Sequence, residues 1–367
     1  MLTISGAILD RIGDPAPYAS SLPLRIGSLS LDDPGPGELL VRIEAAGVCH
    51  SDLSVVSGVR PRPVPMLLGH EAAGIVEAVG AQTSIAVGTR VVMTFLPRCG
   101  SCAACRTGGR APCVVGSAAN GSGVLMGGGS RLREGGASVA HHLGVSAFAD
   151  HAVVDERSVV VVDDDVPPDV AALMGCAVLT GGGAVLNSAG LAPGESLLVV
   201  GLGGVGLAAL LAGLALGATR VTAVDLHPAK LEAAMDLGAH EALTPDEAAE
   251  AGITADVVVE AVGRAVAFEQ AIALTAPGGR TVTVGLPAPD DLATLSPLSL
   301  VAEGRSVIGS YLGGSVPRRD IPRFLALWRE GRLPVEKLVS RHIAFDEIND
   351  AMDELAAGRA VRQIIRF

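Results

Sequence analysis

Residues 196–225 read SLLVVGLGGVGLAALLAGLALGATRVTAVD, and this stretch decides the fold. A short apolar run, Leu197 to Val200, meets a cluster of glycines, and a longer apolar segment then continues to Leu216. Gly217 follows, and a second apolar run leads to Asp225. Short runs bounded by glycine are typical of buried strands, and the longer segment is typical of a buried helix. The stretch therefore predicts a strand, a tight turn, a helix and a second strand parallel to the first.

The same stretch has the length and composition of a membrane span. Residues 196–219 carry no charged side chain, and Gly213 and Gly217 have the spacing seen where helices pair in lipid. Four glycines between residues 201 and 206 would strongly destabilise a spanning helix, however. We favour the buried strand and helix, and expect no binding to a membrane.

The glycines at 201, 203 and 206 fit the pattern G-x-G-x-x-G between a strand and a helix. The first glycine permits the tight turn, the second lets the main chain approach a pyrophosphate, and the third allows close packing of helix on strand. The free N–H groups at the start of the helix attract phosphates. Asp225, 24 residues after Gly201, ends the next strand, where a carboxylate binds ribose hydroxyls and repels a 2′-phosphate. The pattern predicts NAD rather than NADP; the plain alternative is a solvated Asp225 that starts a turn.

The chain on either side divides into two kinds of sequence. From about residue 168, helical segments alternate with expected strands at 196–200, 220–225, 256–261, 280–286 and 306–311. This alternation is typical of βαβ units in a doubly wound parallel sheet, and so of the α/β class. Before residue 160, short runs separated by glycine and proline predict an all-β body, with strands at 38–44, 73–79 and 90–94.

Two further segments complete this division. Residues 116–144 are rich in glycine and lack periodicity, so we expect a long loop or lobe there. After residue 316, expected helices at 319–330 and 345–357 and a strand at 361–365 form a tail that should return to the β body.

The composition excludes several classes of protein. Of 367 residues, 49% are hydrophobic and 18% are charged, which excludes a disordered chain. The net charge of −12 argues against binding to nucleic acid. The first eleven residues lack the basic start and apolar core of a signal peptide. We therefore expect a cytoplasmic protein in a reducing compartment.

Six cysteines in so long a chain are too few for a secreted disulfide scaffold. Four of them, Cys99, Cys102, Cys105 and Cys113, lie within a single turn-rich segment. Four thiolates at this spacing predict a closed tetrahedral zinc site that stabilises a lobe with little core of its own. Disulfides or free thiols are the alternative.

The other two cysteines lie far apart. Cys49 stands in GVCHSD at 47–52, Cys176 follows Gly175, and GHEAAG at 69–74 lies between them with His70. A mixed set of two cysteines and one histidine leaves a fourth zinc position open for substrate, as catalysis requires. Taken singly, a buried cysteine is often only a small hydrophobic residue, and sequence spacing does not show that the three converge.

In combination and in this order, the motifs resemble those of the zinc-dependent alcohol dehydrogenases of the medium-chain dehydrogenase/reductase superfamily. The resemblance covers nearly the whole chain, including the ending VRQIIRF at 361–367. It implies a GroES-like catalytic domain with a structural zinc lobe at 1–177, an inserted Rossmann NAD-binding domain at 178–315, and a return to the catalytic domain at 316–367.

The resemblance also implies roles for individual residues. Cys49, His70 and Cys176 would be the ligands of a catalytic zinc, with Glu71 as a transient ligand. Asp52 would hold the second nitrogen of His70. The remaining implied positions are Ser51 for the proton of the alcohol; His50, Thr180, Gly201, Gly203, Gly204, Val205, Gly206, Asp225, Lys230 and Arg362 for the cofactor; and Arg60, Phe95, His142 and Leu143 for the substrate pocket.

The implied activity is that of a zinc- and NAD-dependent alcohol dehydrogenase. Hydride would pass between an alcohol carbon and NAD, with the alcohol or carbonyl oxygen on zinc. In many relatives a histidine four or five residues after the first zinc cysteine ends the proton relay, and here Ser54 stands at that place. A serine cannot accept a proton near neutral pH, so the proton must leave through water or another base.

Two alternatives stay open. Arg60, Arg62 and His142 could recognise an anionic alcohol or a thiol adduct, as in formaldehyde dehydrogenases that use S-hydroxymethyl glutathione or mycothiol; a solvated basic loop is the plain reading of the arginines. The chain could also be a structural or regulatory NAD-binding protein, although such members generally lack the zinc ligands. The length of the segment at 116–144 resembles that of dimeric members, so we expect a homodimer with an edge strand at 306–313.

Overall fold

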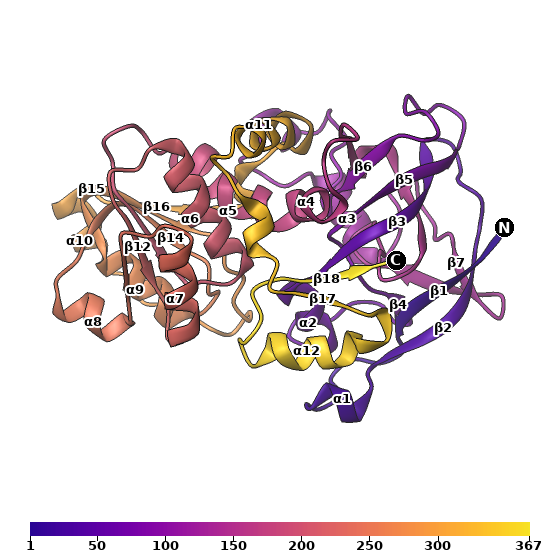
Figure 1. Ribbon diagram of the computed structural model, residues 1–367, viewed down its shortest axis with the longest axis horizontal. Helices are drawn as coiled ribbons and strands as arrows, with labels where there is room; N and C mark the ends of the chain where they lie inside the picture. The colour runs from indigo at the N-terminus through magenta and orange to yellow at the C-terminus, as the bar shows by residue number, and fades with distance from the viewer. The chain divides into compact units, whose positions relative to one another are not determined.

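The computed structural model describes all 367 residues and forms two compact units (Figure 1). The first unit comprises Met1–Thr107, Ala111–Cys176 and Val339–Phe367, and the second comprises Gly108–Arg110 and Ala177–Leu338. The second unit thus extends past the expected end at residue 315. The reason is α11 (Pro317–Arg329), whose Phe324 ring lies so close to Gly182 that a Cβ there would meet it at 2.8 Å.

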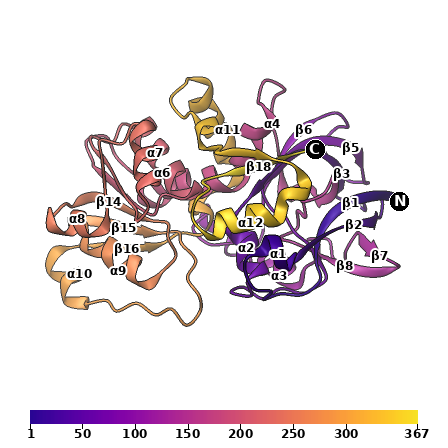
Figure 2. The ribbon, with the colours of Figure 1, turned by 60° about the horizontal axis from the view of Figure 1, so that its bottom comes forward.

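The first unit contains the predicted β body, built from a closed barrel and a seven-stranded sheet (Figure 2). The barrel runs through β1 (Leu2–Leu9), β2 (Leu24–Leu31), β7 (Leu132–Glu134), β8 (Ala137–His141) and β4 (Met66–Leu67). The sheet contains β10 (Val159–Val161), β6 (Arg90–Met93), β5 (Ala72–Val79), β3 (Glu38–Val48), β18 (Gln363–Arg366) and β17 (Arg341–Ile343), with β9 (His151–Asp155) paired to β3. The strands expected at 38–44, 73–79, 90–94 and 361–365 are confirmed.

The prediction that residues 116–144 form a loop without regular elements is wrong. This segment contains most of α3 (Val114–Ser122), and then β7 and β8, which form a hairpin. Gly135 and Gly136 make its two-residue turn with φ of +55° and +87°, a conformation that favours glycine. The two strands are only three and five residues long, and they are held by pairing to β2 and β4. Partners so distant in sequence leave no periodic signal within the segment itself.

Short helices connect these strands. In the first unit they are α1 (Tyr18–Ser21), α2 (His50–Val56), α3, α4 (Pro168–Leu173) and α12 (Ile348–Ala356). The hydrophobic core of the unit gathers Leu39, Val41 and Ile43 of β3 with residues of α2 and α12.

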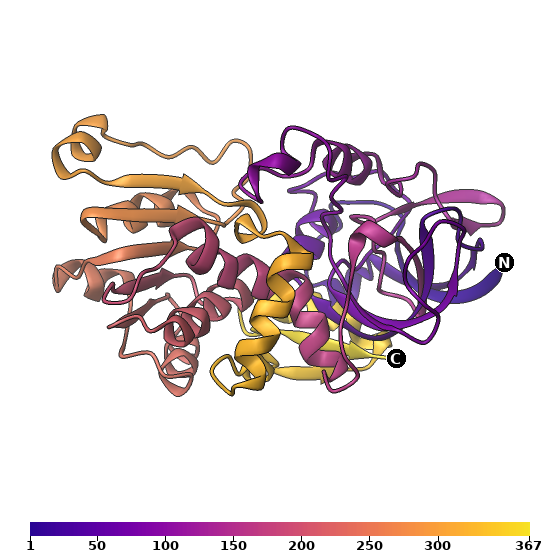
Figure 3. The same ribbon diagram turned by 90° about the horizontal axis from the view of Figure 1, so that it is seen from above.

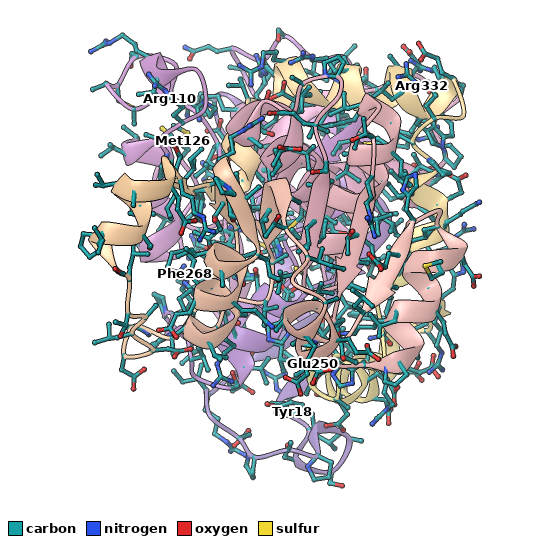
Figure 4. All side chains as sticks on the ribbon, turned by 90° about the vertical axis from the view of Figure 1, so that its left-hand side faces the viewer. Tyr18, Arg110, Met126, Glu250, Phe268 and Arg332 are labelled. Carbon is teal, nitrogen blue, oxygen red and sulfur yellow. The ribbon has the colours of Figure 1, made fainter.

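The second unit is the predicted doubly wound parallel sheet, with helices on both faces (Figure 3). Its order is β13 (Glu241–Leu243), β12 (Val221–Val224), β11 (Leu197–Val200), β14 (Ala255–Glu260), β15 (Thr275–Thr283) and β16 (Ser306–Gly309). Its helices are α5 (Leu179–Gly183), α6 (Gly204–Leu216), α7 (Pro228–Asp236), α8 (Pro245–Glu250), α9 (Ala265–Ala273), α10 (Pro297–Glu303) and α11. Figure 4 views the protein from the side of this unit, and its labels Phe268 and Glu250 mark α9 and α8.

The strand order reverses at β11, because β12 and β13 lie on one side of it and β14 to β16 on the other. Ligands bind at such a switch point, beyond the carboxyl end of the strands. The glycine turn predicted at 201–206 leaves β11 at this end. All five predicted strands are confirmed, whereas the half-buried three-residue β13 was not foreseen.

The reading of 196–219 as a strand, a turn and a helix is confirmed by β11 and α6. A different segment, the helical stretch Pro168–Ala189, has the length and apolar composition of a membrane span. Of its most apolar window, 89% is buried inside the protein, as in a core helix.

Candidate metal centres and nucleotide site

Three distant segments of the first unit bring Cys49, His70, Glu71 and Cys176 together. Cys49 lies between β3 and α2, His70 and Glu71 precede β5, and Cys176 lies in the helical turn after α4. One ligand atom from each of the four lies within 4.8 Å of the others, and all four residues are buried. The Cys176 Sγ is 3.5 Å from His70 Nε2. Convergence that sequence spacing could not show is thus present in the fold.

The donor set fits zinc, which prefers thiolate sulfur and imidazole nitrogen in tetrahedral sites. A hydrogen bond from the Cys176 thiol, together with the charge of Arg362, holds the pKa of Cys49 well below its ordinary value. Both carboxylate oxygens of Glu71 are buried and accept no hydrogen bond. Burial raises the pKa of Glu71 to about 7. A buried, unsatisfied carboxylate beside two thiols and an imidazole is an environment that a cation would complete.

Arg362 is 3% exposed and lies at this cluster. Its Nη2 is 3.4 Å from Glu71 Oε2, and its Nη1 donates to the Val48 carbonyl at 3.4 Å. The guanidinium therefore offsets part of the negative charge that thiolates and a carboxylate would concentrate here.

Asp52 contacts the cluster through His70 and is fully buried. Its Oδ1 is 3.0 Å from His70 Nδ1, and its Oδ2 accepts the Cys49 N–H at 3.1 Å. Asp52 thereby contacts two predicted ligands at once. A carboxylate on the second nitrogen of a ligating histidine fixes the ring and its tautomer.

Of the residues expected in the substrate pocket, some lie at the metal cluster and others lie in a loop outside it. The Phe95 ring meets His70 edge-on with centroids 5.7 Å apart. His142 is 1% exposed, and its Nδ1 lies 3.1 Å from Asp52 Oδ1. Leu143 is buried with φ of +52°, and Arg60 and Arg62 are half-buried in the loop after α2.

The expected proton relay begins in α2, where His50 is exposed and Ser51 is half-buried. The Ser54 hydroxyl donates to the His50 carbonyl at 2.8 Å. Its proton is thus committed to the main chain of its own helix.

The four-cysteine segment also forms a cluster. Its sulfurs lie within 4.8 Å of one another, and Cys99 Sγ is 3.8 Å from Cys105 Sγ. That separation is the edge of a tetrahedron with metal–sulfur bonds of about 2.3 Å. Main-chain N–H groups of Cys102 and Ser101 lower the pKa of Cys99 to about 5. All six cysteines are free, so the disulfide alternative is wrong.

In the second unit, Gly201, Gly203 and Gly206 of the G-x-G-x-x-G turn each stand where the structure gives a physical reason for glycine. Gly201 has φ of +91°, and a Cβ at Gly206 would meet the Gly201 carbonyl oxygen at 1.8 Å. A Cβ at Gly203 would meet nothing within 4 Å, so the chain leaves space there for a ligand. Gly203 caps α6, whose first residues are Gly204 and Val205. An open glycine at a helix N-terminus fits a pyrophosphate.

Asp225 is buried, with 9% exposure, and is not a solvated turn residue. Its Oδ2 accepts the Leu202 N–H at 2.7 Å, and its Oδ1 accepts the His227 N–H at 3.0 Å. Lys230 Nζ lies 3.8 Å from Oδ2. The carboxylate therefore fixes the fingerprint turn. Thr180, also expected at the cofactor, lies half-buried in α5.

Sequence reasoning missed Glu260, which ends β14 and is 1% exposed. Its Oε1 accepts the N–H groups of Val262 and Gly263 at 2.7 and 2.6 Å, and its Oε2 accepts the Thr283 hydroxyl at 2.6 Å. The loop that it fixes packs on Gly201, where a Cβ would meet Val262 at 2.5 Å. An acidic residue at the end of an apolar strand was the available signal, as for Asp225.

A β unit with a buried Cys–His–Glu–Cys cluster and a four-cysteine cluster, together with a parallel-sheet unit carrying a dinucleotide turn, defines a zinc-type dehydrogenase. The sequence matches the alcohol dehydrogenase GroES-like domain over residues 35–164 and the zinc-binding dehydrogenase domain over residues 204–330. The chain belongs to the zinc-dependent alcohol dehydrogenases of the medium-chain dehydrogenase/reductase superfamily.

Individual relatives span the whole chain. Geraniol dehydrogenase of Castellaniella defragrans is 35% identical, over 100% of this chain and 98% of its own. Benzyl alcohol dehydrogenase from Acinetobacter calcoaceticus superposes with a TM-score of 0.91 at 30% identity, and the match covers 100% of both chains. A zinc-binding dehydrogenase from Sinorhizobium meliloti 1021, whose structure is bound to NADP, has a TM-score of 0.80 at 25% identity and is also covered in full.

Proposed function

We propose that this alcohol dehydrogenase uses one catalytic and one structural zinc per chain and transfers hydride from an alcohol to NAD. The observation that carries the proposal is the buried cluster of Cys49, His70 and Cys176, with the unsatisfied carboxylate of Glu71 beside it. Three strong ligands leave one position of a tetrahedral site for a substrate oxygen. Zinc there supplies Lewis acidity, which lowers the pKa of an alcohol.

The chain's own residues hold and neutralise this site. Asp52 orients His70, and Arg362 balances the charge of Glu71 and the thiolates. The Ser51 hydroxyl relays the proton of the alcohol, because it gives up its own proton as it takes one up. Because the Ser54 hydroxyl is committed to the His50 carbonyl, the proton then passes to water rather than along the helix.

The four-cysteine cluster is the structural site. Cys99, Cys102, Cys105 and Cys113 leave no open position, since four sulfurs complete a tetrahedron. The lobe they close is short of apolar core, so the metal–sulfur bonds replace hydrophobic packing as its source of stability.

Asp225 supports NAD as the cofactor. Each of its oxygens accepts one main-chain N–H and keeps a further lone pair, which a ribose hydroxyl can use. A 2′-phosphate would bring negative charge against the same carboxylate. Lys230, whose Nζ lies 3.8 Å from Oδ2 of Asp225, binds the ribose side of the nucleotide.

The relatives named for geraniol and benzyl alcohol suggest alcohols of this kind as substrates. The test is the steady-state reduction of NAD with geraniol, benzyl alcohol and S-hydroxymethyl glutathione. Activity with the two alcohols that is lost on Cys176→Ser supports the proposal. Activity with the thiol adduct alone would favour the formaldehyde dehydrogenase alternative, and NAD binding without turnover would favour a non-catalytic protein.

We also propose a cytoplasmic homodimer without nucleic-acid or membrane partners. Strand β16 is an edge strand that pairs only with β15. Nearby, Leu298 and Val301 of α10 are 75% and 81% exposed. Unpaired strand edges and exposed apolar side chains are what a second copy of the chain would cover. Light scattering should give twice the chain mass, and a Leu298→Glu, Val301→Glu variant should give the mass of one chain.

A further inference from the structure

The main chain at His142 is fixed to the segment that carries His70. The His142 N–H donates to the Ser146 hydroxyl at 2.8 Å, and this hydroxyl donates to the Leu67 carbonyl at 2.9 Å. The residue after Ser146 donates its N–H to the Gly69 carbonyl at 3.2 Å. These contacts do not involve the imidazole of His142, yet they set where it lies relative to His70.

The His142 side chain points at the residue that orients His70. Its Nδ1 lies 3.1 Å from Asp52 Oδ1, and its ring meets the His70 ring edge-on, with centroids 5.4 Å apart and planes at 84°. At 3.1 Å this is a close polar contact, although Nδ1 of His142 makes no hydrogen bond. A buried carboxylate attracts an imidazole N–H through its charge even where the angle does not suit a hydrogen bond. At 1% exposure, no water competes for this contact.

Four nitrogen atoms face the Asp52 carboxylate. Oδ1 faces His70 Nδ1 at 3.0 Å, the Gly69 N–H at 3.3 Å and His142 Nδ1 at 3.1 Å, while Oδ2 faces the Cys49 N–H at 3.1 Å. The His70 ring and the Gly69 N–H take the two lone pairs of Oδ1, and His142 Nδ1 lies beside them without a hydrogen bond. A fully buried carboxylate is nevertheless stabilised by every polar N–H that faces it, because burial keeps bulk water away.

We propose that His142 is a positioning residue of the catalytic metal centre, which holds Asp52 in the orientation that aligns His70. The inference rests on the proposed function, in that a zinc binds to Cys49, His70 and Cys176. The three groups that donate hydrogen bonds to Asp52 belong to the segments that carry the ligands. His142 belongs to the turn that follows barrel strand β8 and is held to Leu67 of barrel strand β4, and so it ties the carboxylate to the barrel.

The test measures the rate at which zinc passes from the protein to a chelating dye. It compares the wild type with the His142→Asn, His142→Gln and His142→Phe variants. The amide nitrogen of an asparagine side chain falls near Nδ1 of a histidine, whereas that of glutamine falls near Nε2. Phenylalanine keeps the ring and loses both nitrogens. We expect the Gln and Phe variants to release one zinc per chain about 10 to 100 times faster than the wild type. The Asn variant should stay near the wild-type rate, and the zinc of the four-cysteine cluster serves as the internal control in every sample.

Release at the wild-type rate from the Gln and Phe variants would overturn the proposal. Equal acceleration in all three variants would overturn it too, since the contact at Nδ1 would then not be what matters. A wild type that holds only one zinc per chain before chelation would instead contradict the proposed function. The Asn and Gln variants have closely related amide side chains, so their comparison does not depend on whether the Phe variant folds.

Discussion

Replacing Asp225 by asparagine removes one charge and keeps the shape of the side chain. In the wild type, two main-chain N–H groups, those of Leu202 and His227, donate to the two carboxylate oxygens at 2.7 and 3.0 Å. An asparagine offers one oxygen and one NH₂ group, so one N–H must face another donor in a buried place. An unsatisfied buried donor costs about 1–3 kcal/mol. We expect the variant to lose about this much stability and to melt at a lower temperature.

The same substitution should change cofactor choice. Two unit charges at 4 Å interact by about 1 kcal/mol in water and about 4 kcal/mol at an effective dielectric constant of 20. Each 1.4 kcal/mol corresponds to about a factor of ten in binding. We therefore expect Asp225→Asn to reduce the preference of kcat/KM for NAD over NADP by about tenfold or more.

The assay is initial-rate reduction of both cofactors at saturating benzyl alcohol, with thermal unfolding measured in parallel. Asp236→Asn is the matched control, because Asp236 is exposed in the same unit and should change neither quantity. A wild type that prefers NADP, or an Asp225→Asn variant with an unchanged ratio, would refute the role given to this carboxylate.

Three further predictions concern other parts of the chain. Cys102→Ser should lower the zinc content by about one ion per chain and reduce the melting temperature, and an unchanged content would show that the four-cysteine cluster holds no metal. Ser54→His should add a fall in hydride-transfer rate below about pH 6.5, since a protonated imidazole cannot accept a proton; an unchanged pH profile would argue against a relay through this position. At Asp169, burial acts to raise the pKa, but the hydrogen bonds from Arg366 and His342 outweigh it and lower the pKa below the ordinary 3.8. This carboxylate therefore contributes its full stabilisation above pH 3.8, and the contribution is lost as the pH falls through the lowered pKa. Asp169→Asn should lower the melting temperature at pH 7 and by progressively less as the pH falls below 3.8.

The parts of the fold that the sequence predicted are those whose signal is local. The strand, turn and helix over 196–225 follow from apolar runs and glycines, and the structure gives Gly201 and Gly206 the steric reasons that the motif implies. The four-cysteine cluster is equally local, because all its sulfurs come from one short segment.

The parts that could not be predicted depend on contacts between distant segments. β7 and β8 exist through pairing with β2 and β4, so residues 116–144 resemble a loop when read alone. The placing of His142 on Asp52 has the same origin, since it requires the turn at 142–146 to dock on Leu67. His142 was visible in the sequence as an expected pocket residue, but the carboxylate that it contacts was not.

The most direct test of the catalytic zinc is the metal content of the purified wild type and of a Cys176→Ser variant, measured by atomic absorption. Cys176 contributes to the Cys49 cluster and to no other, so its loss should leave the four-cysteine cluster intact. We predict about two zinc ions per chain in the wild type and about one in the variant. One zinc per chain in both proteins would contradict a catalytic zinc at Cys49, His70 and Cys176.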